Sequence, residues 1–177
     1  MSPILGIWAS GASAAANTSF ESIATTTVGA GGAANVTFSS IPSTYTHLQL
    51  RIFAINASAS GDVYMQLNSD TGSNYYRHFL YGGGTSIISG GSSATAIYAA
   101  FEHSTGGTGI TDILDYANTN KYKTTRTLMG DDRNGTGDIA LTSGLWLNTN
   151  AISTITVLPP SGSFAQYSSF ALYGIKG

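Results

Sequence analysis

The sequence predicts an all-β protein, a jelly-roll-like antiparallel β-sandwich preceded by an extended N-terminal arm. Short segments rich in apolar and β-branched residues recur along the chain, and turns rich in Gly, Asn and Ser separate them. No segment has the 3.6-residue periodicity of a convincing amphipathic helix, and no repeat of fixed period is present. The length of 177 residues fits an eight-stranded jelly roll better than an immunoglobulin-like domain of about 100 residues.

Residues 1–19 are expected to form the arm, and residues 20–177 a single sandwich domain. The arm carries a cluster of bulky apolar residues near its start: Ile4, Leu5, Ile7 and Trp8. A free tail would leave these side chains in water, so we expect the cluster to be an assembly contact that docks on a neighbouring molecule. A frayed terminus or an edge strand of the same domain is the alternative.

The strands of the domain are assigned from local patterns. Residues 20–28 are rich in Thr and Ile, and a glycine turn leads to a return strand at 34–39. Residues 47–57 give the clearest strand, with Leu48, Leu50, Ile52 and Ala54 on a core face and a mixed opposite face. Further strands are expected at 63–67, 75–81, 95–101, 110–116, 123–129, 144–147, 152–158 and 169–175.

Charge and cysteine content exclude several classes of function. Charged residues make up 9% of the chain, against about 25% in ordinary domains. Seven scattered Lys and Arg residues supply no basic stripe for nucleic acid. The chain has no cysteine, which excludes disulfides, thiolate zinc sites and iron–sulfur clusters. No apolar run approaches the 18 or so residues of a membrane span, and the N-terminus lacks the basic region of a signal peptide.

Residues that could carry catalysis are few and scattered. No Gly-x-Ser-x-Gly pentapeptide is present, so there is no nucleophile elbow. The histidines, His47, His78 and His103, have no companion histidine at i+2 or i+4, and the only glutamates are Glu21 and Glu102. We therefore expect no catalytic residues, no cofactor and no enzymatic activity.

One segment has part of a calcium-binding pattern. Counted from Asp132, oxygen-bearing residues fall at positions 1, 3 and 5 (Asp132, Asn134 and Thr136), and Gly137 is at position 6. Position 12, which requires a bidentate Glu, is Ser143. Asp and Asn in Gly-rich segments usually form turns, so a turn is favoured and no metal site is predicted.

Tyrosine is abundant near the expected turns and strand ends, at Tyr75, Tyr76, Tyr81, Tyr98, Tyr116, Tyr122 and Tyr167. Rings flanked by Asn and Asp can stack on sugars and hydrogen-bond to them. Tyrosine also fills sandwich cores and interfaces, where an apolar ring with a hydrated hydroxyl belongs, and this second role is favoured.

Two segments resemble the opening of virion structural proteins of tailed bacteriophages, with those of cyanobacterial and other aquatic phages closest. These segments are Phe20-Glu-Ser-Ile-Ala-Thr-Thr-Thr-Val-Gly29 and Ala34-Asn-Val-Thr-Phe-Ser-Ser-Ile-Pro-Ser-Thr-Tyr-Thr-His-Leu-Gln-Leu-Arg51. Pro3-Ile-Leu-Gly-Ile-Trp-Ala-Ser10 and Ser169-Phe-Ala-Leu-Tyr-Gly-Ile175 are similar to the ends of such proteins. The resemblance is thin between about 60 and 140, and its motifs identify no active site.

The resemblance implies a virion surface protein, and small jelly-roll proteins of this kind often sit on capsids as trimers. We expect a capsid decoration (cement) protein that binds the major capsid protein and itself as a homotrimer. It would lie on the capsid surface after assembly in the host bacterial cytoplasm. The alternative is a tail or head fibre adhesin module that binds host cell-surface glycans, and a free secreted carbohydrate-binding module is a weaker third.

Overall fold

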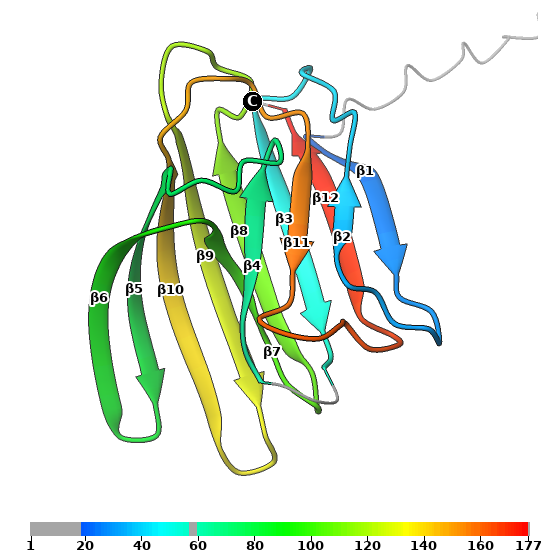
Figure 1. The fold of residues 1–177 in the computed structure, drawn as a ribbon, viewed down its shortest axis with the longest axis vertical. Helices are drawn as coiled ribbons and strands as arrows, with labels where there is room; N and C mark the ends of the chain where they lie inside the picture. The colour runs from blue at the N-terminus through cyan, green and yellow to red at the C-terminus, as the bar shows by residue number, and fades with distance from the viewer. Residues whose placement is uncertain (1–18, 57–59, 177) are drawn as a thin grey trace, which may run out of the picture.

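A computed structural model of the chain describes residues 19–56 and 60–176. The regular secondary structure in these ranges consists of β-strands (Figure 1). The strands are β1 (Phe20–Thr27), β2 (Val36–Phe38), β3 (His47–Ala54), β4 (Gly61–Leu67), β5 (Tyr75–Gly83), β6 (Ser86–Ala94), β7 (Ile97–Glu102), β8 (Gly107–Leu114), β9 (Lys123–Asp132), β10 (Gly137–Trp146), β11 (Ile155–Leu158) and β12 (Ser169–Ile175). Neighbouring strands pair antiparallel in two sheets. The predicted all-β antiparallel sandwich is therefore confirmed, while the jelly-roll assignment stays a prediction.

The two sheets differ in width. The large sheet has eight strands in the order β1-β12-β3-β8-β9-β10-β5-β6, and the small sheet has four in the order β2-β11-β4-β7. The small sheet lies against one part of the large sheet, and β5 and β6 extend beyond it (Figure 1). We call the side of the large sheet that faces the small sheet the inner face and the opposite side the outer face. No described strand covers the outer face.

The core lies between the two sheets and follows the alternation of the strands. On β3, Leu48, Leu50, Ile52 and Ala54 are buried, as the sequence predicts. Buried residues of the small sheet pack against them from the other side, among them Val63, Met65, Leu67, Ile155 and Val157.

Glycine allows the two sheets to approach closely where β7 crosses β8. A Cβ atom on Gly109 would lie 2.0 Å from the carbonyl oxygen of Ala99 and 2.7 Å from Cα of Ala100. Any side chain at position 109 would therefore push β7 away from the inner face.

Threonine hydroxyls on the inner face are buried beneath β7. The Thr127 hydroxyl donates to the Tyr98 carbonyl oxygen at 3.1 Å, and its own oxygen lies 2.8 Å from that of Thr111, which is also 3.4 Å from the Ala99 carbonyl oxygen. These bonds satisfy carbonyl groups of β7, an edge strand of the small sheet, and hold that strand on the large sheet.

The strand assignments need several corrections, including at β8, which begins at Gly107 rather than 110, and β9, which ends at Asp132 rather than 129. β6 was not predicted, because Ser86–Ala94 consists mainly of Ser and Gly and lacks alternation. β10 begins at Gly137 rather than 144, since its first half pairs with both β9 and β5. β11 begins at Ile155 rather than 152, and Ile152 is a buried loop residue.

Candidate functional site

Four exposed aliphatic residues form a continuous row across the outer face. Leu80 on β5, Leu141 on β10, Leu128 on β9 and Ile110 on β8 are direct register partners from one strand to the next. Each is between 43% and 51% exposed. Ile139, which is 59% exposed, follows on β10. We call Leu80, Leu141, Leu128 and Ile110 the aliphatic row.

A polar row lies next to the aliphatic row on the same face. Arg126 forms an ion pair with Asp112 at 3.0 Å, and the Gln49 amide donates to the same carboxylate at 2.9 Å. The polar groups of this row thus bond to one another and do not extend over the aliphatic row. An apolar strip bordered by polar groups is the usual composition of a protein–protein interface.

An aromatic recess lies on the inner face where the large sheet extends past the small one. It has a volume of about 210 Å³, and its aromatic walls are Phe79 and Tyr81 of β5 and Tyr98 and Phe101 of β7. Asp62 is its acidic residue. Burial raises the pKa of the Asp62 carboxyl, and the positive charge of Arg77 partly offsets this rise.

Arg77 lines a second hollow of about 400 Å³, together with Tyr64 and Gln66. Its guanidinium carbon lies 4.2 Å from the centre of the Tyr98 ring and 5.5 Å from that of Tyr64. Its Nε is buried and has no hydrogen-bond partner among the described residues. The two hollows therefore offer aromatic rings, the carboxyl group of Asp62 and the guanidinium group of Arg77.

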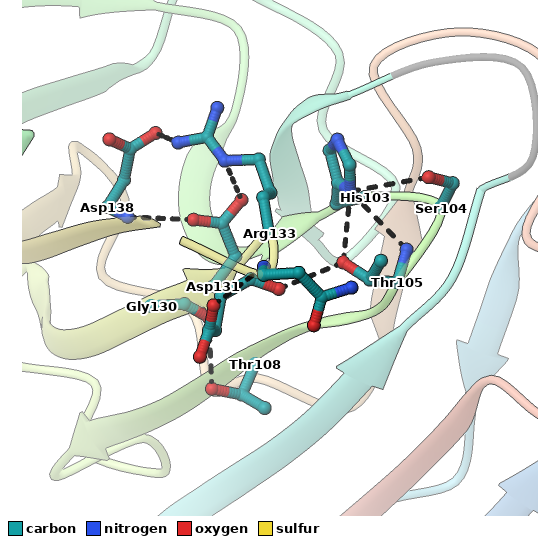
Figure 2. A network of polar contacts seen from close by, with 10 residues as sticks. His103, Ser104, Thr105, Thr108, Gly130, Asp131, Arg133 and Asp138 are labelled. Carbon is teal, nitrogen blue, oxygen red and sulfur yellow. Dashed lines mark hydrogen bonds and ion pairs between the residues drawn. The ribbon is translucent and has the colours of Figure 1, made fainter. Parts of the chain in front are cut away.

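The segment with the partial calcium pattern forms the hairpin between β9 and β10, shown in Figure 2. Arg133 forms ion pairs with both Asp131, at 3.3 Å, and Asp138. The Asp132 carboxylate accepts the backbone N–H of Asn134 at 2.9 Å, which is the hydrogen bond of an Asx turn. The arginine therefore pairs with the two aspartates that flank the pattern, Asp132 forms a turn, and the described residues contain no group of three His, Cys, Asp or Glu side chains that could hold a metal ion.

The three histidines and two glutamates that the sequence singles out belong to different environments. His47 accepts the backbone N–H of Asp115 through Nδ1 at 2.9 Å, and the ring of His78 lies 4.9 Å from that of Tyr76. His103 bonds to Thr105 within its own turn (Figure 2). The Ser104 hydroxyl oxygen also lies 3.4 Å from Nδ1 of His103 (Figure 2). Glu21 lies on the large sheet and Glu102 on the small sheet.

The seven tyrosines divide between core and surface. Tyr75 and Tyr116 are fully buried. Tyr81 and Tyr98 line the aromatic recess, and Tyr76, Tyr122 and Tyr167 are exposed. Core filling, which the sequence favours, thus accounts for two of them, while two others line a recess that sequence spacing did not indicate. Their shared location arises from pairing between strands, which has no local signal.

The predicted arm contacts Ile4, Leu5, Ile7 and Trp8 lie outside the described residues. No helix in the part of the chain that the structure describes is long and apolar enough to span a membrane. No protein-family model, curated protein or solved structure matches this chain.

Proposed function

We propose that the protein is a non-enzymatic virion surface protein, a capsid decoration (cement) protein that stabilises a phage shell as a homotrimer. The observation that carries the proposal is the aliphatic row on the outer face. Monomeric soluble proteins rarely expose a contiguous apolar patch without a binding role. Four aliphatic side chains aligned across four adjacent strands therefore favour a protein that attaches to other proteins.

The charge of the chain supports the same role. Its formal net charge is −2, and Arg126 and Asp112 of the outer face pair with each other. Copies packed side by side on a shell repel one another little when each has so small a net charge. Contacts through uncharged groups also depend little on salt concentration.

The resemblance to phage virion proteins names the partners in this proposal. They are the major capsid protein and other copies of the chain, with the capsid surface as the location and the host bacterial cytoplasm as the place of assembly. A reconstruction of the virion tests this directly. Density for the chain on capsid lattice axes is the expected result, and density confined to the tail would contradict a cement role.

Deleting residues 2–10 is expected to leave the domain folded and to weaken trimerisation or capsid binding. The deletion removes Ile4, Leu5, Ile7 and Trp8, and burying even one such side chain contributes about 1.5–3 kcal/mol. We expect at least a roughly tenfold loss of affinity. Sedimentation and capsid co-pelleting measure it, and circular dichroism checks the fold. Normal decoration by a truncated trimer would show that the arm is not the anchor.

The second candidate is a fibre adhesin module that binds host glycans in the aromatic recess. The recess favours it because aromatic faces stack on sugar rings while Asp62 and Arg77 hydrogen-bond to hydroxyls. On a glycan array, saturable binding would support this candidate, and the absence of binding would favour the cement role.

If a glycan binds there, Asp62→Asn is expected to weaken binding about tenfold or more, because it replaces an acceptor-only carboxylate. Asp112→Asn on the outer face is the matched control and is expected to leave glycan binding unchanged. Isothermal titration with the best array ligand measures both. Equal affinities for the two variants would exclude the recess as the binding site.

A further inference from the structure

β6 is an open edge of the large sheet with none of the usual protection. Its sequence, Ser86-Ile-Ile-Ser-Gly-Gly-Ser-Ser-Ala94, contains no charged residue and no proline. Natural sheets usually block their edges with lysine, proline, a bulge or a very short strand. Two of the other three edges show such features: β1 has Glu21 and a bulge, and β2 is three residues long.

The register shows which backbone groups of β6 are free. A two-residue turn at Gly84–Thr85, with φ of +58° at Gly84, joins β5 to β6 and leaves Gly83 opposite Ser86. Such a loop closes on a hydrogen-bonded pair, so every second residue from Ser86 onward bonds to β5. The N–H and C=O groups of Ile87, Ser89, Gly91 and Ser93 therefore point away from the sheet.

Both sides of this edge also carry exposed apolar side chains. Ile87 on the outer face is 77% exposed and lies beside Leu80 and Ile139, while Ile88 on the inner face is 53% exposed. A strand added to β6 would therefore be stabilised if it were apolar on both of its faces.

We propose that β6 accepts the N-terminal segment Pro3–Ser10 of a second copy of this chain as a ninth strand. In extended form that segment places Ile4 and Trp8 on one face and Leu5 and Ile7 on the other. It thus supplies apolar partners for the exposed side chains Ile87 and Ile88 on the two faces of β6, as in other cases of strand addition. This inference deepens the homotrimer part of the proposed function and rests on it.

The position of the arm in the sheet indicates exchange between copies. Ser19 precedes β1, which lies at the opposite edge of the eight-stranded sheet from β6. A ninth strand beyond β6 would lie eight strand spacings from β1, which amount to about 38 Å. The 11 residues from Trp8 to Ser19 span about 36–40 Å when fully extended, so a copy could reach its own β6 only with no slack. Head-to-tail exchange among three copies closes into a ring.

Ser89→Pro in the full-length chain tests the proposal, with Ser89→Ala as the matched control. Proline removes an outward N–H that β5 does not use, whereas alanine keeps it. We expect Ser89→Pro to raise the trimer dissociation constant at least about tenfold, and Ser89→Ala to change it less than about twofold. Sedimentation equilibrium gives both constants, and thermal melting checks that the variants fold.

A cross-linking experiment applies even if Ser89→Pro does not fold. The chain has no native cysteine, so a Gly6→Cys chain and a Ser89→Cys chain can be mixed and treated with a short bismaleimide. We expect a product joining the two chains, and little product when Thr37→Cys, on the open edge of β2, replaces Ser89→Cys.

The outcomes separate this inference from the proposed function. A Ser89→Pro trimer as stable as the wild type, or equal cross-linking at Thr37, would overturn the β6 contact and leave the homotrimer standing. Cross-linking within one chain carrying both cysteines, without any between the single-cysteine chains, would overturn exchange between copies. A wild-type chain that is monomeric at every concentration would overturn the homotrimer itself.

Discussion

Replacing Lys123 with methionine is expected to lower the free energy of unfolding by about 3–5 kcal/mol. The Lys123 side chain is fully buried, and its Nζ donates to the carbonyl oxygens of Asn118 at 2.5 Å, Lys121 at 2.9 Å and Thr149 at 2.9 Å. An ammonium group has three donors, and all three are used here. Burial lowers the pKa of this ammonium group, and the positive charge of Lys121 acts in the same direction. Methionine would fill the space but leave the three carbonyl groups without the donor that Lys123 supplies.

Lys121→Met is the matched control for this prediction. The Lys121 side chain is 52% exposed and pairs with Asp115, so its loss is expected to cost less than about 1 kcal/mol. Urea unfolding at pH 7 measures both variants. A similar, small effect at the two positions would mean that the three carbonyl contacts of Lys123 contribute little to stability.

Glu102→Gln is expected to stabilise the protein at alkaline pH. Glu102 is 1% exposed, accepts a hydrogen bond from Asn56 at 2.7 Å, and has no partner for its Oε2 among the described residues. Burial raises its pKa to about 7 from the ordinary value of 4.5, although the Asn56 bond acts in the opposite direction. The folded protein therefore holds a proton between about pH 4.5 and 7 that the unfolded chain releases. Stability falls as the pH rises through this window.

Glutamine resembles the protonated acid and does not titrate. Its advantage over Glu102 is expected to be near zero at pH 4.5 and to reach about 3 kcal/mol at pH 8. Glu21→Gln is the control, because Lys176 lowers the pKa of Glu21 and its substitution should not stabilise the protein at alkaline pH. Unfolding curves at both pH values would refute the prediction if the two glutamine variants behaved alike.

The sequence predicts strands where apolar and polar residues alternate strongly. It is a poorer guide to which face of a strand is buried. β3 was identified with its core face because Leu48, Leu50 and Ile52 alternate with polar residues. On β9 the alternation was clear but did not say which face is buried. The structure buries Thr125 and Thr127 and exposes Leu128. Hydroxyl bonds to the backbone of β7, a strand distant in sequence, account for the burial of Thr127.

β6 could not be predicted, because what makes it a strand lies on its partner. The Phe79 and His78 rings cover Gly90 and Gly91, where a Cβ atom would lie 2.8 Å and 2.6 Å from the nearest ring atom. Aromatic cover of this kind compensates for the weak strand preference of glycine. The aliphatic row and the aromatic recess also depend on strand order, which local sequence does not encode. By contrast, the apolar cluster of the arm can be recognised without knowledge of the fold, because its residues are close together in the sequence.

The two ends of the domain are neighbours, and this arrangement determines how the domain bears tension. The Lys176 amide donates to the Ser19 carbonyl at 3.0 Å, and Phe20 is the register partner of Ile175. Pulling these ends apart would load the hydrogen bonds between β1 and β12 one after another, which is the unzipping geometry of an antiparallel pair. A domain tethered at both ends should therefore yield at low force by peeling off β1. Tethered through the N-terminal segment alone, it would not experience that load.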